Sequence, residues 1–527
     1  MKSYKNSLKF LIILLLLLGI FFRFFNLDKK IYWPDEAVTS LRISGYTRKE
    51  LVQQAFNGHE INIEYLAKFK GINQDKTVID TIKSLAVEEP QLPPLYFVVL
   101  RFWVQFFGDS VAAIRSFSAF ISLFAFPCMY WLCRELFESP LVGWVAIGLI
   151  AISPFHLLYA QEARPYSLWI VTILLSSAAL LRAIRLQTKF SWGIYAVCMT
   201  LGLYSFLFSG FVTIGHGIYV FIREGFRLTK IVTAFMLSSL AGLLALTPWT
   251  LAIMSNFSKT QGGTNWASQK ASFISLTTMW AGNISRLFID FGVGSDDPLP
   301  YFIPLIPFIL ILSILVVYSL YFIYRHTLKQ VWLFIFILIA VTALTLILAD
   351  LIIGGRRSGV ARYLIPCYLG IQIAVAYLLA NKLFSFNVNL KQQKFWKCAA
   401  VLLFVSGFLS CLISSQAQIW WNKGPKLTQY NLQASYIINQ GTNSLLLSDD
   451  DPAYILSLSY LLYPKVRLQA VVKPRVIKIS QKYSDLFLYK PSDEFRKILE
   501  NEYNFKFEQN KELGSYQEKL WQLVKEN

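Results

Sequence analysis

Two adjacent carboxylates, Asp35 and Glu36, come shortly after the first apolar segment of the chain, residues 10–22. Basic residues precede that segment, and a basic flank keeps the N-terminus of a membrane helix in the cytoplasm. The chain therefore reaches the far side of a membrane and presents two carboxylates there. Such groups are costly to desolvate and do nothing for insertion, so the pair indicates catalysis or binding. A solvated loop turned by Pro34 is the alternative interpretation.

A second candidate site is a glycine–arginine turn that contains Arg356, Arg357 and Arg362. We expect this turn on the outer side, where the positive-inside rule does not account for arginines. Arginine binds phosphate in a bidentate manner, and the pair Gly354-Gly355 lets backbone approach closely. The turn is therefore expected to bind a donor phosphate; pairing with Asp350 and with lipid headgroups is the alternative.

Polar residues gather in two further outer segments, at 88–96 and 159–166. Tyr96 and Tyr166 are candidates for contact with a sugar or a phosphate, although aromatic residues at this depth also form interfacial belts. A carboxylate can accept the proton of an acceptor hydroxyl while cations stabilise a departing phosphate. Carboxylates and arginines on one face of a membrane thus point to glycosyl transfer from a lipid-phosphate donor.

Composition indicates a polytopic membrane protein. The chain has 527 residues, is 55% hydrophobic and has a mean hydropathy of +0.47, which is typical of several membrane spans. The net charge of +19 falls largely in short clusters between apolar runs. That distribution follows the positive-inside rule and is not a nucleic-acid footprint, so we expect no nucleic-acid partner.

Eleven membrane spans are expected, the first near residues 10–22 and the others near 112–133, 141–159, 167–186, 191–207, 209–222, 231–254, 301–324, 331–353, 363–381 and 398–418. Most are close to the roughly 20 residues that a helix needs to cross the hydrocarbon. A further apolar stretch ends at Phe107 and carries Arg101 at its centre. If it spanned the membrane, the basic clusters would lie outside, so we expect an outer juxtamembrane helix at 93–107.

The chain changes character after about residue 420. Short apolar runs alternate with helix-like stretches, which predicts a small α/β domain at 420–527. The expected fold is an all-α polytopic membrane domain over 1–419, with an outer loop at 26–111, followed by this extracytoplasmic domain. The N-terminus is expected in the cytoplasm, and the protein in the inner or plasma membrane of the cell.

Four motifs in this order resemble those of bacterial type C glycosyltransferases. They are Asp35-Glu36, Pro93-Pro94-Leu95-Tyr96, Arg115-Ser116-Phe117-Ser118, and the run from Ser153 to Tyr166. The chain is similar to members of the protein O-mannosyltransferase and aminoarabinose transferase superfamily, that is, to family 39-like or Rgt-like membrane enzymes. The resemblance covers about residues 1–380.

The resemblance implies an inverting transfer of a sugar from a polyprenyl phosphate to a hydroxyl of a glycan, lipid or protein. Asp35 takes the place of the general base, with Glu36 orienting it or binding the acceptor. The expected substrate-binding residues are Glu89, Gln91, Tyr96, Gln161, Glu162, Arg164 and Tyr166. Many relatives have histidine where this chain has Leu92. Without clustered His or Cys ligands we expect no cofactor and no metal, although some distant relatives hold a divalent ion with acidic residues.

Two other functions fit a polytopic chain. A transporter or flippase of lipid-linked sugars would place charges near mid-membrane, on interrupted helices within an internal repeat. A non-catalytic sensor would act through residues 420–527 and leave the outer carboxylates and arginines without a role. Because the charged residues gather at one surface, the enzyme is favoured.

Overall fold

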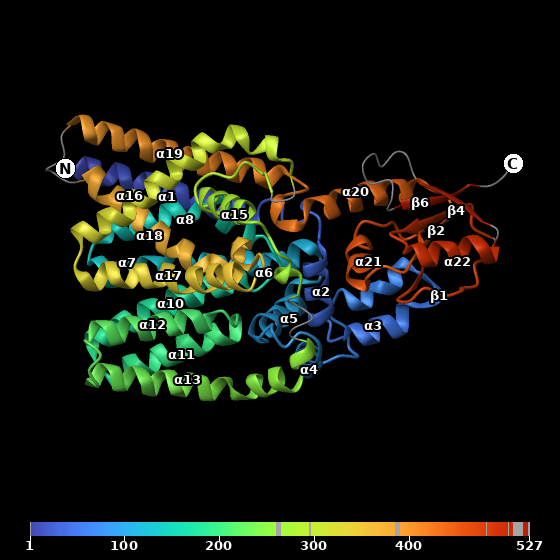
Figure 1. Ribbon diagram of the computed structural model, residues 1–527, viewed down its shortest axis with the longest axis horizontal. Helices are drawn as coiled ribbons and strands as arrows, with labels where there is room; N and C mark the ends of the chain where they lie inside the picture. The colour runs from blue at the N-terminus through green and yellow to red at the C-terminus, as the bar shows by residue number, and fades with distance from the viewer. Residues whose placement is uncertain are drawn as a thin grey trace. The chain divides into compact units, whose positions relative to one another are not determined.

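The computed structural model describes residues 2–259, 265–294, 297–384, 390–480, 482–503, 505–509 and 520–524. Helices dominate this part of the chain, together with a six-stranded sheet (Figure 1). The chain divides into two compact units. The first comprises Met1–Lys29, Glu89–Tyr96 and Arg115–Ala417, and the second Lys30–Glu88, Phe97–Ile114 and Gln418–Asn527.

The first unit is a helical bundle (Figure 1). Its helices are α1 (Lys2–Phe24), α6 (Val111–Leu123), α7 (Ala125–Phe137), α8 (Pro140–Ala151), α9 (Pro154–Ala160), α10 (Tyr166–Leu186), α11 (Lys189–Ser205), α12 (Ser209–Arg223), α13 (Lys230–Ser255), α15 (Phe273–Ser285), α16 (Ile306–His326), α17 (Lys329–Ile352), α18 (Ile365–Phe384) and α19 (Leu390–Gln416).

The bundle has a buried centre and an apolar exterior. In the spans that contain α10 and α18, 83% and 89% of the most apolar stretch is buried, against 17% and 28% in those of α16 and α17. On α16, Ile311 and Ile314 are 64% and 67% exposed. Apolar surface on this scale requires a lipid environment, so the chain is a multi-pass membrane protein.

Seven helices in the described residues are long and apolar enough to cross a membrane, or eight if the bent pair α8 and α9 forms one span. The expected count of eleven is not confirmed. The apolar part of α1 (Phe10–Phe24) and the helices α11 and α12 each have fewer than 18 residues. Helices are nevertheless present at all eleven expected positions.

The break between α8 and α9 bends the chain by 63°. Arg23, 1% exposed, donates from Nη1 to the carbonyl of Ala151 at 2.8 Å and from Nη2 to that of Ile150 at 3.1 Å. Its Nε donates to Ser122 Oγ at 3.0 Å. The last carbonyls of a helix lack intrahelical partners, so this buried arginine stabilises the end of α8.

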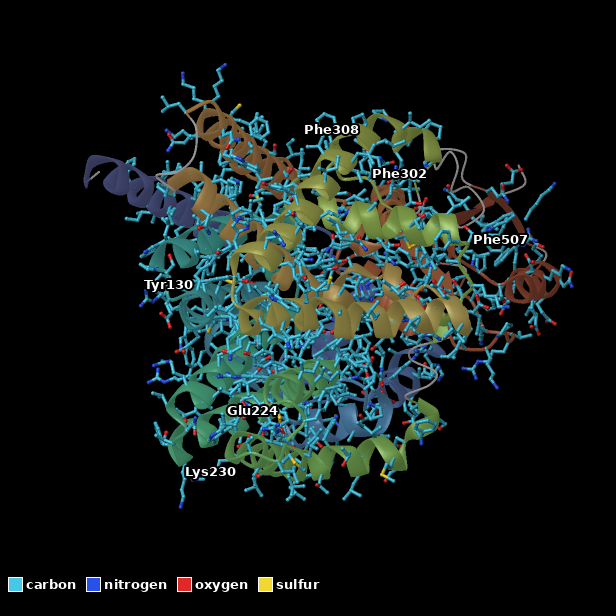
Figure 2. The ribbon with its side chains drawn as sticks, turned by 60° about the vertical axis from the view of Figure 1, so that its left-hand side comes forward. Tyr130, Glu224, Lys230, Phe302, Phe308 and Phe507 are labelled. Carbon is cyan, nitrogen blue, oxygen red and sulfur yellow. The ribbon has the colours of Figure 1, made fainter. Side chains whose placement is uncertain are left out.

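A connection flanked by basic residues joins α12 and α13, and Figure 2 labels Glu224 in this connection and Lys230 at the start of α13. Glu224 Oε2 accepts a hydrogen bond from Thr229 Oγ1 at 2.8 Å, and the Thr229 side chain caps α13. Arg227 lies in the same connection, and Arg223 is the last residue of α12. The position of this connection on the cytoplasmic side remains a prediction.

The second unit contains the sheet, in the order β1-β3-β2-β4-β6-β5. Its strands are β1 (Asn57–Asn62), β2 (Ser444–Ser448), β3 (Arg467–Val471), β4 (Asp485–Tyr489), β5 (Lys506–Gln509) and β6 (Leu520–Val524). Strands β3, β2 and β4 are parallel, and the remaining pairs are antiparallel. The helices α20 (Pro425–Gln440), α21 (Pro452–Leu458) and α22 (Asp493–Tyr503) accompany them. Leu445, Leu488 and Phe495 lie in the core.

Most of the first outer segment, residues 30–88 and 97–111, belongs to this second unit. The segment forms α2 (Pro34–Ile43), α3 (Arg48–Ala55), α4 (Val78–Glu88) and α5 (Leu95–Phe107). Its strand β1 pairs antiparallel with β3, with Glu60 opposite Gln469. The unit therefore contains more than the expected domain at 420–527. The sequence of β1, Asn-Gly-His-Glu-Ile-Asn, lacks the apolar alternation that indicates a strand.

Helix α5 coincides with the expected juxtamembrane helix 93–107, apart from a start at Leu95. Arg101 in its middle is 1% exposed and donates to the carbonyls of Ile43 and Lys76. Protein carbonyls therefore satisfy this charge, which the sequence places within an apolar stretch.

Candidate functional site

The arginine turn lies between α17 and α18. The buried Asp350 carboxylate accepts from Arg357 Nη1 at 3.2 Å, from Ser358 N at 2.6 Å and from Ser358 Oγ at 2.7 Å. Gly355 has φ of +142°, and a Cβ there would overlap Arg357 Nη1 and Asp350 Oδ1. The glycine is thus explained by the approach of Arg357 to Asp350, which is the alternative role considered for this turn.

The other two arginines lie beside one indole ring. The guanidinium carbons of Arg356 and Arg362 lie 5.7 Å and 5.4 Å from the ring centre of Trp266. The loop that carries Trp266 is fixed to the turn, because Arg356 N donates to the Ala267 carbonyl at 2.9 Å and Arg357 Nη2 to Ser268 Oγ at 2.8 Å. Stacking on an aromatic face orients a guanidinium while its N–H groups can still bind an anion.

Arg362 also connects the turn to the outer segment 159–166, the second outer loop. Its guanidinium lies 5.8 Å from the ring centre of Tyr166 and 5.7 Å from that of Tyr363. Tyr166 packs edge-on against Tyr159 at 5.2 Å. Two segments expected to contribute to one site, separated by almost 200 residues of sequence, therefore meet in the bundle.

A second junction joins three of the sequence motifs. The buried Tyr96 hydroxyl lies 2.7 Å from Ser118 Oγ, and Ser118 Oγ donates to the Arg164 carbonyl at 3.5 Å. Gln161 has a structural task, since its Nε2 donates to the carbonyls of Phe22 and Phe25 at 2.7 and 2.9 Å, at the end of α1. These contacts fix the second outer loop to α1 and to the Pro-Pro segment.

Of the remaining candidates of this unit, Glu162 and Arg164 are buried, while Glu89 and Gln91 are partly exposed. Glu162 is fully buried and Arg164 is 7% exposed. Gln91 Oε1 is buried without a hydrogen bond from the described residues. Next to it in sequence, the Pro90 carbonyl accepts from Trp249 Nε1 at 3.0 Å. Substrate contact by Glu89, Gln91, Glu162 and Arg164 remains a prediction.

Asp35 and Glu36 belong to the second unit, in the first turn of α2. Pro34 begins this helix, as its fixed φ and missing N–H suit a helix start. Glu36 is fully buried, and its Oε2 lies 2.5 Å from Lys423 Nζ. Asp35 is only partly buried. The N-terminus of a helix favours negative charge at both positions. Because Glu36 is buried against Lys423 and Asp35 is partly exposed, the two adjacent carboxylates have distinct surroundings.

The electrostatic environment of Asp35 includes the α/β part of the same unit. Burial raises the pKa of the Tyr454 phenol above its usual value, and the carboxylates of Asp451, Asp450 and Asp35 raise it further. Because the Asp35 carboxylate acts on Tyr454, the start of α2 lies close to the first turn of α21. Asp450 also lies 3.4 Å from Lys490 Nζ.

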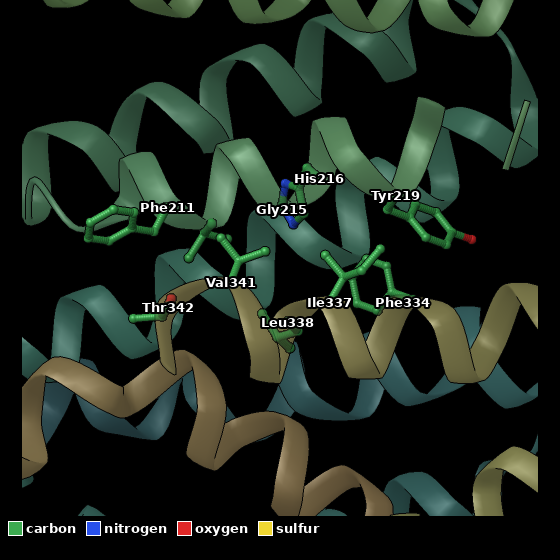
Figure 3. Close-up of a pocket in the computed structure, with 10 residues that line it drawn as sticks. Phe211, Gly215, His216, Tyr219, Phe334, Ile337, Leu338, Val341 and Thr342 are labelled. Carbon is green, nitrogen blue, oxygen red and sulfur yellow. The ribbon is translucent and has the colours of Figure 1, made fainter. Parts of the chain in front are cut away.

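A small cavity lies between α12 and α17, lined in part by His216, Phe334 and Val341 (Figure 3). Its volume of about 10 Å³ has room for about one water molecule and none for a sugar. His216 Nε2 lies 3.2 Å from Ser177 Oγ and its Nδ1 3.3 Å from Tyr195 OH. This satisfied core histidine contributes nothing to the candidate site.

Two residues that contact candidate residues, one in each unit, were missed by the sequence analysis. Trp266 follows a polar stretch without a recognisable motif, and Lys423 had no expected partner. The expected spans 231–254 and 301–324 imply an outer loop between them, and this was the one available signal for Trp266. Among the described residues, no group of three or more His, Cys, Asp or Glu side chains could hold a metal ion.

No protein-family model matches the chain, and no curated protein matches it in sequence. The fold is that of type C glycosyltransferases, which confirms the expected resemblance at the level of the fold. It is similar to the apo crystal structure of the aminoarabinose transferase ArnT from Cupriavidus metallidurans. The TM-score is 0.50 at 12% identity, over 92% of this chain and 93% of that one.

Two further solved structures are similar. ArnT from Cupriavidus metallidurans bound to undecaprenyl phosphate has a TM-score of 0.49 at 11% identity, covering 97% of each chain. The archaeal oligosaccharyltransferase AglB from Archaeoglobus fulgidus, in complex with an inhibitory peptide and a dolichol-phosphate, has a TM-score of 0.44 at 12% identity. That match covers 90% of this chain and 62% of AglB.

Proposed function

We propose that this protein is a membrane glycosyltransferase that moves a sugar from a polyprenyl-phosphate donor to an acceptor hydroxyl on the extracytoplasmic face of the cell membrane. The transfer inverts the configuration of the sugar, with Asp35 as general base. The pair of arginines beside Trp266 is the observation that carries this proposal. In a type C glycosyltransferase fold, these two arginines form a cationic site beside an aromatic ring that suits a phosphate.

The donor phosphate binds Arg356 and Arg362. Arginine forms charge-assisted, bidentate contacts with phosphate oxygens, and two such groups neutralise the charge that develops on a departing phosphate. ArnT from Cupriavidus metallidurans, which has the same fold, has also been crystallised with undecaprenyl phosphate. That observation supports a lipid phosphate as the class of donor.

Asp35 removes the proton from the acceptor hydroxyl. An inverting transfer needs a base within hydrogen-bond reach of that hydroxyl, on the face opposite the departing phosphate. Asp35 is partly exposed, whereas Glu36 is buried in an ion pair with Lys423. This difference supports Asp35 as the base and Glu36 as the residue that orients it.

The test measures sugar transfer by the purified protein in lipid nanodiscs, with polyprenyl-phosphate sugars as donors and product release followed by mass spectrometry. Asp35→Asn keeps the shape and removes the base, so turnover should fall by a factor on the order of 10²–10⁴ while donor binding persists. Asp28→Asn is the matched control, because Asp28 is an exposed carboxylate close in sequence to the same helix.

Two results would contradict these assignments. Full turnover by Asp35→Asn, together with loss of turnover in Glu162→Gln, would place the base in the second outer loop. Movement of the lipid-linked sugar between leaflets without any transfer would instead favour the transporter or flippase.

A further inference from the structure

A buried ion pair joins Glu36 to the chain that follows the last apolar helix of the bundle. Lys423 Nζ lies 2.5 Å from Glu36 Oε2, and the two side chains are 1% and 0% exposed. Lys423 ends a short 3₁₀ turn, Trp421–Lys423, just before α20. The two residues are 387 positions apart in sequence and belong to the same compact unit.

The segment around Lys423 also contacts the chain that enters α2. Ile31 N donates to the Gln418 carbonyl at 3.1 Å. Ser457 Oγ of α21 donates to the Tyr32 carbonyl at 2.6 Å, and the Tyr32 hydroxyl lies 2.7 Å from Ser40 Oγ within α2. Residues after position 417 thus fix both the entry to α2 and its first turn.

The other end of α2 is held by a second ion pair. Arg42 Nη1 lies 2.6 Å from Glu88 Oε2, at the end of α4. Glu88 also accepts from the backbone N–H groups of Arg48 and Lys49, which begin α3. Burial would raise the pKa of Glu88, but Arg42 and these N–H groups outweigh it and lower the value. Helix α2 is therefore restrained at both ends.

We propose that Lys423 is a positioning residue for the reaction, acting through Glu36 on the adjacent Asp35. This inference rests on the proposed function of Asp35 as general base. Lys423 and Glu36 are both held away from water as an ion pair. Because Glu36 lies in the first turn of α2, this pair leaves that turn few orientations. The C-terminal part of the chain thereby contributes to catalysis without contact with substrate.

The energetics favour a positioning role over simple stabilisation. Desolvation of two charges cancels much of their mutual attraction, so a buried ion pair adds little net stability. Removal of one partner is strongly destabilising, because it leaves the other charge buried and unpaired. Such a pair therefore specifies one arrangement of the groups around it, here the start of the helix that carries Asp35.

The test compares Lys423→Met, Lys423→Arg and the double variant Glu36→Gln/Lys423→Met in the full chain in nanodiscs. Two measurements are made: kcat and donor KM for sugar transfer, and hydrogen–deuterium exchange of residues 34–43. Lys423→Met should lower kcat by about 10²-fold, the effect of a misplacement of about 1 Å, with donor KM unchanged. Exchange in α2 should accelerate in the same variant.

The other variants separate positioning from folding. Lys423→Arg keeps the charge and should retain most of kcat, and the double variant should recover part of it because no charge remains unpaired. The control is Lys482→Met, which removes an exposed ion pair with Glu60 in the same unit and should change neither measurement.

The proposal is overturned if folded Lys423→Met keeps wild-type kcat, or if exchange in α2 stays unchanged. It is also overturned if the double variant is no better than Lys423→Met. Failure of the proposed function has a different signature. The wild-type protein would then transfer no sugar, while exchange in α2 would still show whether Lys423 holds this helix.

Discussion

The three arginines of the turn after α17 should divide into two functional classes. Arg357 pairs with the buried Asp350, whereas Arg356 and Arg362 lie beside Trp266. Under the proposed function, Arg356→Ala and Arg362→Ala should raise donor KM. A charge-assisted contact contributes about 1.5–3 kcal/mol, and every 1.4 kcal/mol is tenfold. Each single variant should therefore need roughly 10- to 100-fold more donor.

Arg357→Ala should act on stability instead. It leaves the Asp350 carboxylate with only Ser358 N and Oγ as hydrogen-bond partners from the turn. Loss of one partner of a buried pair costs about 3–5 kcal/mol, and we expect less because the Arg357 side chain is 27% exposed. The thermal unfolding midpoint should fall, and Asp350→Asn/Arg357→Gln should recover part of the loss.

Donor KM and the thermal midpoint, measured on the same nanodisc preparations, distinguish the two classes. Trp266→Ala should raise donor KM by less than the arginine variants do, because it removes the shared aromatic face without removing charge. If Arg357→Ala raised donor KM as much as Arg356→Ala does while its midpoint stayed unchanged, the division would be refuted. All three arginines would then belong to the phosphate site.

Two further predictions concern topology and pH. Gln269 and Gln392 are both exposed but are expected on opposite sides of the membrane. In a cysteine-free background, Gln269→Cys should therefore react with an impermeant thiol reagent applied from outside, and Gln392→Cys should not. The reverse result would overturn the eleven-span topology. Burial lowers the pKa of Lys70 from 10.5 to about 8, so between pH 8 and 10.5 the unfolded chain binds more protons and the free energy of unfolding should rise with pH. Urea unfolding at pH 7 and pH 9 should show this rise in the wild-type protein and a smaller one in Lys70→Met, and equal rises would contradict the assignment.

The sequence predicted the features that depend on local pattern. Runs of apolar residues mark the helices at the eleven expected positions, because lipid allows only segments whose backbone groups are paired internally. The helix α15, which lies between two of these positions, was not predicted. A helix at 93–107 was also predicted and is present, while its position outside the membrane, inferred from Arg101 and from the distribution of basic clusters, remains a prediction. The local sequence did not predict the strand β1 (Asn57–Asn62). This polar edge strand depends on its pairing with β3.

The missing parts of the candidate site depend on contacts between residues far apart in sequence. No periodicity indicates that Lys423 pairs with Glu36 or that Trp266 lies against Arg356 and Arg362. For Arg357 the sequence favoured a phosphate site, with an ion pair to Asp350 as the alternative. The approach of Asp350 across seven residues supports the alternative, and it is a contact that the sequence pattern does not specify.

The position of α2 bears on the function of the α/β part of the chain. In the compact unit that contains Asp35, the sheet receives its edge strand β1 from the same outer segment. The Asp35 carboxylate also contributes to raising the pKa of the Tyr454 phenol at the start of α21. A change in the α/β fold therefore alters the surroundings of the proposed base directly. For this reason the residues after position 417 belong to the catalytic apparatus that we propose and are more than a soluble appendage.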